Sequence, residues 1–176
     1  MLAARSGIGR DMTDLLEGEY EPSPADWVRE QVATYEATDG REANVLRGNP
    51  DWPIVVITSR GAKSGKLRKN PVMRVERDGK YVAVASKGGA DDNPTWYANF
   101  IANPVVQLQD GSEPALYNAR LLEGEERQEW WDLAVETWDT YAEYQKKTDR
   151  EIPVFLLEPV EVTGYSVPPA DAPPTS

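Results

Sequence analysis

The sequence contains no cysteine and no histidine. Without cysteine, the chain cannot form disulfides, ligate an iron–sulfur cluster or use a thiolate as a nucleophile. Without histidine, it has no Ser-His-Asp triad and no imidazole acid or base, and it lacks the commonest ligand of transition metals. Any chemistry must come from tyrosine, lysine, serine or carboxylate side chains, or from a bound organic cofactor. The cofactor is the more economical explanation.

The chain also lacks a long hydrophobic run. No segment approaches the roughly 18 apolar residues that a membrane-spanning helix needs, and residues 1–10 have no apolar core of the signal-peptide kind. We therefore expect a cytoplasmic protein, and no sequence feature supports peripheral membrane contact. In a chain of 176 residues we expect one domain at 23–166, between a flexible arm (1–22) and a disordered tail (167–176). The sequence does not distinguish a monomer from a homodimer.

Positive charge is scarce overall but concentrated in one segment. The net charge is −11, yet residues 60–90 contain nine lysines and arginines and only two acids, a local balance of +7. The overall negative charge would repel DNA or RNA, so we expect no nucleic-acid partner. This basic island favours a small polyanionic ligand instead. The alternative is a solvated hairpin that is rich in basic residues.

Local patterns predict a mixed fold dominated by strands. Ser23 followed by Pro24 is typical of a helix start, and the Asp78-Gly79 pair is typical of a hairpin turn. The predicted helices span 24–38, 94–102 and 125–147, and the predicted strands span 54–57, 70–77, 80–85, 105–109, 115–122 and 152–157. We therefore expect an α+β, mainly β fold: a meander closed into a small antiparallel barrel, with an N-terminal helix and a long helix before the last strand.

A glycine-bracketed turn opens the basic island. Gly61 and Gly65 enclose Lys63 and Ser64, and glycines let backbone amides approach a ligand closely. The turn is not a nucleotide-binding P-loop, because Ala62 precedes the lysine and a strand follows in place of a helix. It suits a phosphate group, which amides, a hydroxyl and fixed positive charge can bind.

Several short motifs follow one another between Pro53 and Pro159. They are Gly61–Gly65, Arg68, Asn70-Pro71, Ala85–Gly89, Asn93-Pro94, Trp96-Tyr97, Asn103-Pro104, Tyr141–Gln145, Thr148–Arg150, Ile152-Pro153 and Glu158-Pro159. Together they closely resemble the deazaflavin-dependent nitroreductase family. The resemblance implies a split β-barrel of the FMN-binding type and a reduced coenzyme F420 that passes a hydride to quinones, nitroaromatics or activated enones, with no metal. Such a coenzyme carries the two-electron chemistry, which accounts for a sequence without histidine or cysteine.

The resemblance also implies which residues bind the coenzyme. F420 has a phosphate and an oligoglutamate tail, and both are anionic, which gives the basic island a partner. Lys63, Ser64, Gly65 and Arg68 are expected to hold the phosphate, and Lys66 and Lys69 to guide the tail. Pro71, Ser86, Lys87 and Trp96 are expected to line the pocket for the ring, with Asn70 and Ala85 as further coenzyme contacts.

Two tyrosines match the substrate pocket of this family. Tyr141 and Tyr144 lie three residues apart on one helical face. We expect Tyr141 to donate a proton or hydrogen bond to the acceptor and Tyr144 to form a wall, since a phenol with a pKa of about 10 stays protonated at neutral pH. The alternative is that both are packing residues. Trp138 stands where the best-known members have tyrosine, so the acceptor pocket should be reshaped and reduction of nitroimidazoles is left open.

Two other functions remain as alternatives at the level of sequence. One is a carrier that binds F420 without turnover. The other is a flavin-dependent reductase or haem-degrading protein on the same type of barrel, because a fold does not determine a function.

Overall fold

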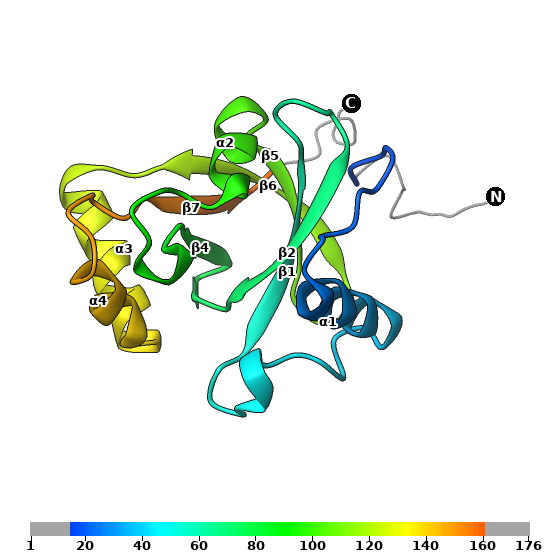
Figure 1. Cartoon of the computed structure of the whole chain (residues 1–176), viewed down its shortest axis with the longest axis horizontal. Helices are drawn as coiled ribbons and strands as arrows, with labels where there is room; N and C mark the ends of the chain where they lie inside the picture. Colours follow the sequence, from blue (N-terminus) through cyan, green and yellow to red (C-terminus); the bar gives the residue numbers. More distant parts are fainter. Residues whose placement is uncertain (1–14, 161–176) are drawn as a thin grey trace, which may run out of the picture.

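The computed structural model describes residues 15–160, and Figure 1 shows how its elements are arranged. One sheet contains β1 (Ile54–Arg60), β2 (Leu67–Met73), β3 (Glu76–Arg77), β4 (Lys80–Val84), β5 (Val105–Gln109), β6 (Pro114–Leu121) and β7 (Val154–Pro159). The helices are α1 (Asp26–Ala37), α2 (Thr95–Ala102), α3 (Gly124–Thr137) and α4 (Thr140–Gln145), with short 3₁₀ turns η2 (Leu46–Gly48) and η3 (Lys87–Gly89). Residues 1–14 of the predicted arm and the predicted tail lie outside the described residues.

The sheet curls into a half-barrel. Its strand order is β2-β1-β5-β6-β7-β4-β3, so β2 and β3 are outer strands at opposite ends. Only Arg74 and Val75 connect them, and so short a link brings the two outer strands together. Asp110, in the turn between β5 and β6, holds this link: it accepts hydrogen bonds from Arg74 (Nε–Oδ2 2.8 Å) and from the Tyr81 hydroxyl of β4 (2.6 Å). The prediction of a mainly β, split-barrel fold is confirmed.

The pairing of the strands differs from the predicted meander. The predicted strand 70–77 is two strands, because β2 pairs antiparallel with β1 and only β3 returns to β4. The return uses the predicted turn, where Asp78 (φ 57°) and Gly79 (φ 80°) are both left-handed, as a tight hairpin requires. Further along the chain, β5 pairs with β1, and β7 lies between β6 and β4. The sequence of 70–77 reads as one strand because nothing at Arg74 and Val75 marks the point where pairing with β1 ends and pairing with β4 begins.

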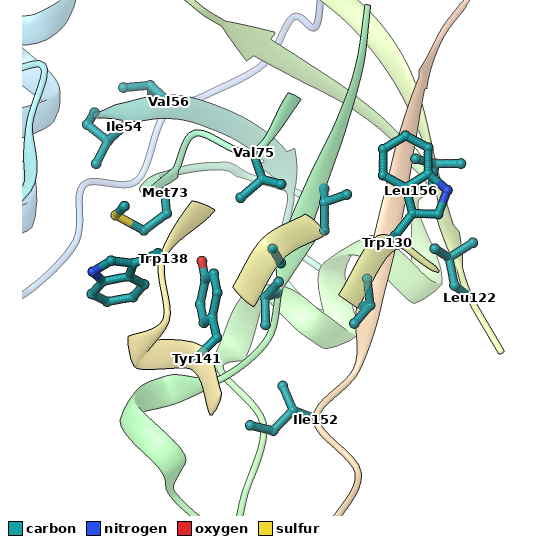
Figure 2. Close-up of a cluster of buried hydrophobic side chains, with 14 of the residues drawn as sticks. Ile54, Val56, Met73, Val75, Leu122, Trp130, Trp138, Tyr141, Ile152 and Leu156 are labelled. Atoms are coloured by element: carbon teal, nitrogen blue, oxygen red, sulfur yellow. The ribbon is translucent and has the colours of Figure 1, made fainter. Parts of the chain in front are cut away.

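β1 separates two hydrophobic cores, which explains its unbroken apolar sequence. Ile54 and Val56 point into a core with side chains from α1, α3 and α4, part of which Figure 2 shows. Val55 and Ile57 point the other way, into a core with α2 and Phe155 of β7. Successive side chains of a strand point to opposite faces, so a strand that is buried on both sides needs apolar residues throughout.

The single helix predicted over 125–147 is wrong. α3 ends at Thr137 and α4 begins at Thr140, because Trp138 between them is extended (φ −148°, ψ 97°). The Trp138 side chain is only 7% exposed and packs edge-to-face against Tyr141, with ring centroids 4.9 Å apart. Burial of the indole and its aromatic contacts stabilise this interruption, and the Trp138 amide still donates to the Ala134 carbonyl at the end of α3.

The segment before α1 lies along the outer edge of β2. The Leu67 amide donates to the carbonyl of Glu19 (2.7 Å), and the Glu21 amide donates to the carbonyl of Leu67 (2.9 Å). Arg60 joins this segment to the β1–β2 turn, since its guanidinium donates both to the Glu17 carbonyl and to the Gly65 carbonyl. In the described part of the chain, no helix has the length and apolar character needed to cross a bilayer.

Candidate active site

A cleft of about 290 Å³ opens where β2, η3, α2 and α4 meet. It gathers seven of the residues that the sequence predicted for the ring pocket and the acceptor site: Asn70, Pro71, Ser86, Lys87, Trp96, Tyr141 and Tyr144. Trp138 also lines it. Ala85 does not, since it is fully buried in the core beside α2. Residues as distant in the sequence as Asn70 and Tyr144 thus line one cleft.

One wall of the cleft is the outer edge of β2. Leu67 turns its backbone groups away from β1, toward Glu19 and Glu21. Alternate residues of a strand in an antiparallel sheet direct their backbone groups to the same side, so Lys69 and Pro71 also face outward. Pro71 has no amide hydrogen to leave unpaired there, which is why proline is tolerated on an edge strand. This edge presents the apolar ring of Pro71 to the cleft.

The opposite wall is the turn after β4, which has an unusual backbone. Lys87, Gly88 and Gly89 are successive left-handed residues, with φ of 47°, 67° and 86°. The amides of Gly89 and Ala90 close the turn onto Ser86 and Lys87, whereas the amides of Lys87 and Gly88 donate to no other described residue. Two adjacent free amides in such a turn form a site for an anionic or carbonyl oxygen.

The third wall is aromatic and comes from the α3–α4 junction. Trp138 makes edge-to-face contacts with Tyr141 and, at 5.8 Å between centroids, with Tyr144. Figure 2 shows the Tyr141 ring beside the Trp138 indole with its hydroxyl pointing away from α4. Burial, and to a lesser extent the neighbouring Tyr144, raises the pKa of the Tyr141 phenol above its usual value. In neutral solution this side chain is therefore a hydrogen-bond donor and not a base.

The predicted phosphate and tail residues lie apart from the lining of this cleft, on the β1–β2 turn and the first part of β2. Within the turn, the Ser64 Oγ accepts a hydrogen bond from the Lys66 amide (3.1 Å). A Cβ on Gly61 would lie 2.7 Å from that oxygen and 3.2 Å from the Lys66 carbonyl oxygen, so a larger residue would have to displace the Ser64 hydroxyl. Gly65 has φ 74°, again a glycine conformation. The hydrogen bonds within the turn and the glycine conformation define its shape.

Carboxylates of the chain itself lie against three of these cations. Lys66 pairs with Glu19 (Nζ–Oε2 3.5 Å) and Arg68 pairs with Glu21 (Nη1–Oε1 3.8 Å). Lys69 pairs with a carboxylate of α1, that of Glu36. These partners are at least partly exposed, so each pair is worth about 1 kcal/mol or less. Lys63 forms no ion pair with any residue of 15–160.

Sequence reasoning missed residues that α1 and η2 contribute to the cleft. Trp27 of α1 is 58% exposed and lines the cleft together with Arg47. Arg47 has a left-handed backbone (φ 52°), which is uncommon for a residue other than glycine. Trp27 and Val28 are adjacent apolar residues of the predicted helix 24–38, and the sequence alone could not show that Val28 is buried while Trp27 is exposed.

Comparisons with known proteins agree with the resemblance found in the sequence. The sequence profile of the F420H(2)-dependent quinone reductase family matches residues 27–159. A putative F420H(2)-dependent quinone reductase of Mycobacterium tuberculosis is 32% identical over 61% of this chain and 90% of that protein. Another F420H(2)-dependent quinone reductase of that organism is 31% identical over 71% of this chain and 85% of that protein.

Two solved structures are more similar in sequence. An F420-H2 dependent reductase (FDR-A) is 58% identical, with a TM-score of 0.58 over 65% of this chain and 97% of that chain. A chain described as a domain-swapped dimer is 54% identical, with a TM-score of 0.61 over 77% of this chain and all of that chain. The family profile covers most of the described residues, from α1 to the end of β7. The protein therefore belongs to the F420H(2)-dependent quinone reductase family and is an F420H2-dependent oxidoreductase.

Proposed function

We propose that the protein reduces a quinone with F420H2 in the cleft between β2, η3 and α4. The observation that carries this proposal is the convergence of predicted coenzyme residues and predicted acceptor residues on one cleft. The reduced coenzyme, when bound, supplies a hydride, which is two electrons and one proton. The protein then has to bind both molecules side by side, exclude water and provide the second proton.

The residues present fit the coenzyme. Pro71 and Trp96 offer apolar surfaces for a flat ring, and the free amides of Lys87 and Gly88 suit a ring carbonyl. The β1–β2 turn brings fixed positive charge for a phosphate. Among its cations, Lys63 forms no ion pair with another described residue that would compete with the phosphate. This arrangement supports the sequence-based assignment of the phosphate to Lys63, Ser64, Gly65 and Arg68.

We assign Tyr141 the role of proton donor to the acceptor. Hydride addition places negative charge on a quinone oxygen, and a neutral phenol can donate to that oxygen as the charge develops. The Tyr141 hydroxyl is available for this role, since burial raises its pKa and keeps it protonated, and it is hydrogen-bonded to no other residue of 15–160. Solvent reprotonates the phenol after the hydroquinone leaves. Trp138 and Tyr144 close the acceptor side and limit its width.

The acceptor class that the site supports best is a quinone. The Trp138 indole fills space that a smaller ring would leave open, and its Nε1 is buried without a hydrogen-bond partner in the described residues. The wall that it forms is flat and largely apolar, which suits a planar ring with oxygens only at its rim. A nitroaromatic compound would need additional donors for its nitro group.

The direct experiment mixes the protein with F420H2 and menadione and follows the absorbance of the oxidised coenzyme. Parallel samples contain reduced FMN or NADH in place of F420H2. Oxidation that requires both protein and menadione, with F420H2 alone, supports the proposal. Binding of F420H2 without turnover by any quinone would favour the carrier alternative, and turnover with reduced FMN would favour a flavin enzyme.

The phosphate site has its own test. The double substitution Lys63→Ala/Arg68→Ala removes two fixed charges and should weaken F420 binding by about a hundredfold, the value of two charge-assisted hydrogen bonds at the low end of their range. Lys80→Ala/Arg77→Ala removes the same charge from the β3–β4 hairpin, outside the cleft, and should leave binding unchanged. Equal affinity of the first variant and the wild type would reject this phosphate site.

For assembly we propose a homodimer. The relative described as a domain-swapped dimer supports this choice over the monomer. Light scattering coupled to size-exclusion chromatography would give the mass directly, and a mass near 19.6 kDa at micromolar concentration would contradict it.

A further inference from the structure

Arg150, in the link between α4 and β7, is bonded to the turn that forms one wall of the cleft. Its guanidinium donates to the carbonyls of Ala90 (2.9 Å), Ser86 (3.0 Å) and Ala85 (3.3 Å). It also donates to the Oδ1 of Asn93 (2.8 Å). The side chain is half-buried, so these are charge-assisted hydrogen bonds with limited access to water, stronger than bonds between neutral groups. One residue thus binds four acceptors in the segment 85–93.

The segment 85–93 needs such a support. Its three left-handed residues include Lys87, for which this backbone conformation costs roughly 1 kcal/mol or more. Two backbone hydrogen bonds within the turn oppose this cost, from Gly89 to Ser86 and from Ala90 to Lys87. Among the described residues, the carbonyls of Ala85 and Ala90 accept from no donor other than Arg150, whereas the Ser86 carbonyl also accepts from the Gly89 amide. The guanidinium therefore fixes the turn in the shape that leaves the Lys87 amide free toward the cleft.

The backbone of Arg150 is in turn tied to α4. Gln145, the last residue of α4, donates from Nε2 to the Arg150 carbonyl (2.7 Å), and its Oε1 accepts from the Ile152 amide (3.0 Å). Thr148 adds a hydrogen bond to Asp91 of the turn (2.8 Å). The side-chain end of Arg150 thus holds the turn, and its backbone end holds the helix that carries Tyr141 and Tyr144.

We propose that Arg150 is a positioning residue, which sets the separation between the wall assigned to the coenzyme and the wall that carries the proton donor. This inference rests on the proposed function for the identity of the two ligands. Hydride transfer needs reacting atoms about 3–3.5 Å apart, and a displacement of 1 Å costs about a hundredfold in rate. Because Arg150 is hydrogen-bonded both to the turn 85–93 and to Gln145 of α4, its contacts act directly on the distance between the two walls. Arg150 itself does not line the cleft.

Lysine cannot replace Arg150 in this role. An arginine carries five donors in a rigid planar fork, whereas a lysine carries three donors on one freely rotating nitrogen. A lysine at 150 would keep the charge and most of the apolar stem but could reach only part of the four acceptors. Arg150→Lys is therefore a mild variant that separates the fork geometry from the charge. Arg120→Lys is the matched control, because Arg120 makes ion pairs with Glu126 and Glu158 and does not line the cleft.

The first readout is hydrogen exchange in the protein without ligand. In Arg150→Lys, the amides of Gly89 and Ala90 should exchange faster by about tenfold or more, the value of at least one charge-assisted hydrogen bond. Exchange in β1 and β5 should stay as in the wild type, which excludes global unfolding. Arg120→Lys should match the wild type throughout. Wild-type exchange of 85–93 in Arg150→Lys would overturn the inference.

The second readout is the rate of hydride transfer in a single turnover with saturating F420H2 and menadione. We expect this rate to fall about tenfold or more in Arg150→Lys, with a smaller change in the KM for menadione. Added methylguanidinium should restore part of the rate that Arg150→Ala loses, whereas Arg120→Ala should have the wild-type rate with and without methylguanidinium. If the turn exchanges faster in Arg150→Lys but hydride transfer keeps its wild-type rate, Arg150 stabilises the turn without positioning the reactants, and the proposal is refuted. If the wild-type protein reduces no quinone, the proposed function fails, and the exchange experiment still decides whether Arg150 holds the turn.

Discussion

Replacement of Tyr141 by phenylalanine is the sharpest test of the proposed chemistry, because it removes one hydroxyl and keeps the ring. The side chain is 3% exposed and packs edge-to-face on Trp138, and phenylalanine can make the same contact. The hydroxyl has no hydrogen-bonded partner among the described residues that could be left unpaired. We therefore expect the free energy of unfolding to change by less than about 1 kcal/mol.

The expected effect on turnover is far larger. Loss of one donor to a developing oxyanion in a site without water costs roughly a hundredfold to a thousandfold in rate. The affinity for F420 should stay within a few-fold of the wild type, since Tyr141 is assigned to the acceptor side. The pH dependence gives a second criterion. Burial raises the pKa of Tyr141 above about 10, the value for a free tyrosine, so the wild-type rate should not fall as the pH rises from 8 to about 10.

The raised pKa of Tyr141 also makes the free energy of unfolding decrease at high pH. The folded protein holds the Tyr141 proton more tightly than the unfolded chain does, so this contribution to stability is intact below about pH 10 and is lost above it. Tyr141→Phe should therefore show a shallower decline of stability above pH 10 than the wild type. Urea titrations between pH 8 and 11 would measure the difference.

Stopped-flow absorbance with enzyme-bound F420H2 and menadione would measure the rate, and fluorescence titration would measure coenzyme affinity. Tyr144→Phe is the control within the same cleft and should retain most of the rate. A wild-type rate in Tyr141→Phe would refute the assignment of the donor. A loss confined to Tyr144→Phe would transfer the role to that residue. Weakened coenzyme binding with an unchanged rate would make Tyr141 a coenzyme contact.

Three further predictions concern the surroundings of the cleft. Glu19→Gln combined with Glu21→Gln should strengthen F420 binding by a few-fold in low salt and not in 0.5 M salt, because these two weak ion pairs no longer compete with F420 for Lys66 and Arg68. Titrations at both salt concentrations test this, and a gain in affinity that persists in high salt would contradict it. Gly89→Ala should lower the free energy of unfolding by about 2 kcal/mol or more, since φ is 86° and a Cβ would lie 2.8 Å from the Tyr144 carbonyl oxygen. Gly88→Ala is the control: its Cβ would meet no atom within 4 Å, and it should lower the free energy of unfolding by about 1 kcal/mol. Equal shifts in the melting temperatures of the two variants would refute the steric reason. Trp138→Tyr should change the KM for menadione more than the affinity for F420, and the reverse would place the indole on the coenzyme side.

Local signals in the sequence identified the elements well. The strand predicted at 105–109 coincides with β5, and the Asp78-Gly79 pair forms the expected hairpin turn. Both depend on interactions within a few residues: alternation along one strand, and a backbone conformation that Asp and Gly adopt with little strain. The family motifs added the location of the site, because residues from several of them, at Asn70-Pro71, Ser86-Lys87, Trp96, Tyr141 and Tyr144, line one cleft.

What could not be predicted depends on contacts between distant parts of the chain. The sequence pattern through Arg74 does not show that β2 and β3 lie at opposite ends of the sheet. The helical periodicity of 125–147 continues through Trp138, and only the aromatic neighbours that surround the indole in the folded state make the interruption favourable. The basic residues of the β1–β2 turn were expected to be free for a ligand, and the carboxylates that pair with Lys66 come from a segment that the sequence marked as a flexible arm.

The interruption at Trp138 has a consequence for how relatives of this protein can diverge. α3 carries Trp130 and Ala134 into the core, so its sequence is constrained by the stability of the whole domain. α4 is a separate short helix that touches the cleft and the turn after β4. Because the two helices are joined by an extended residue, a position of α4 that lines the cleft and is only partly buried, such as Tyr144, can change without unwinding α3, whereas Tyr141 is constrained by the same core as α3. Selection for a new acceptor can therefore act on this short segment while the sheet that holds the coenzyme is inherited unchanged.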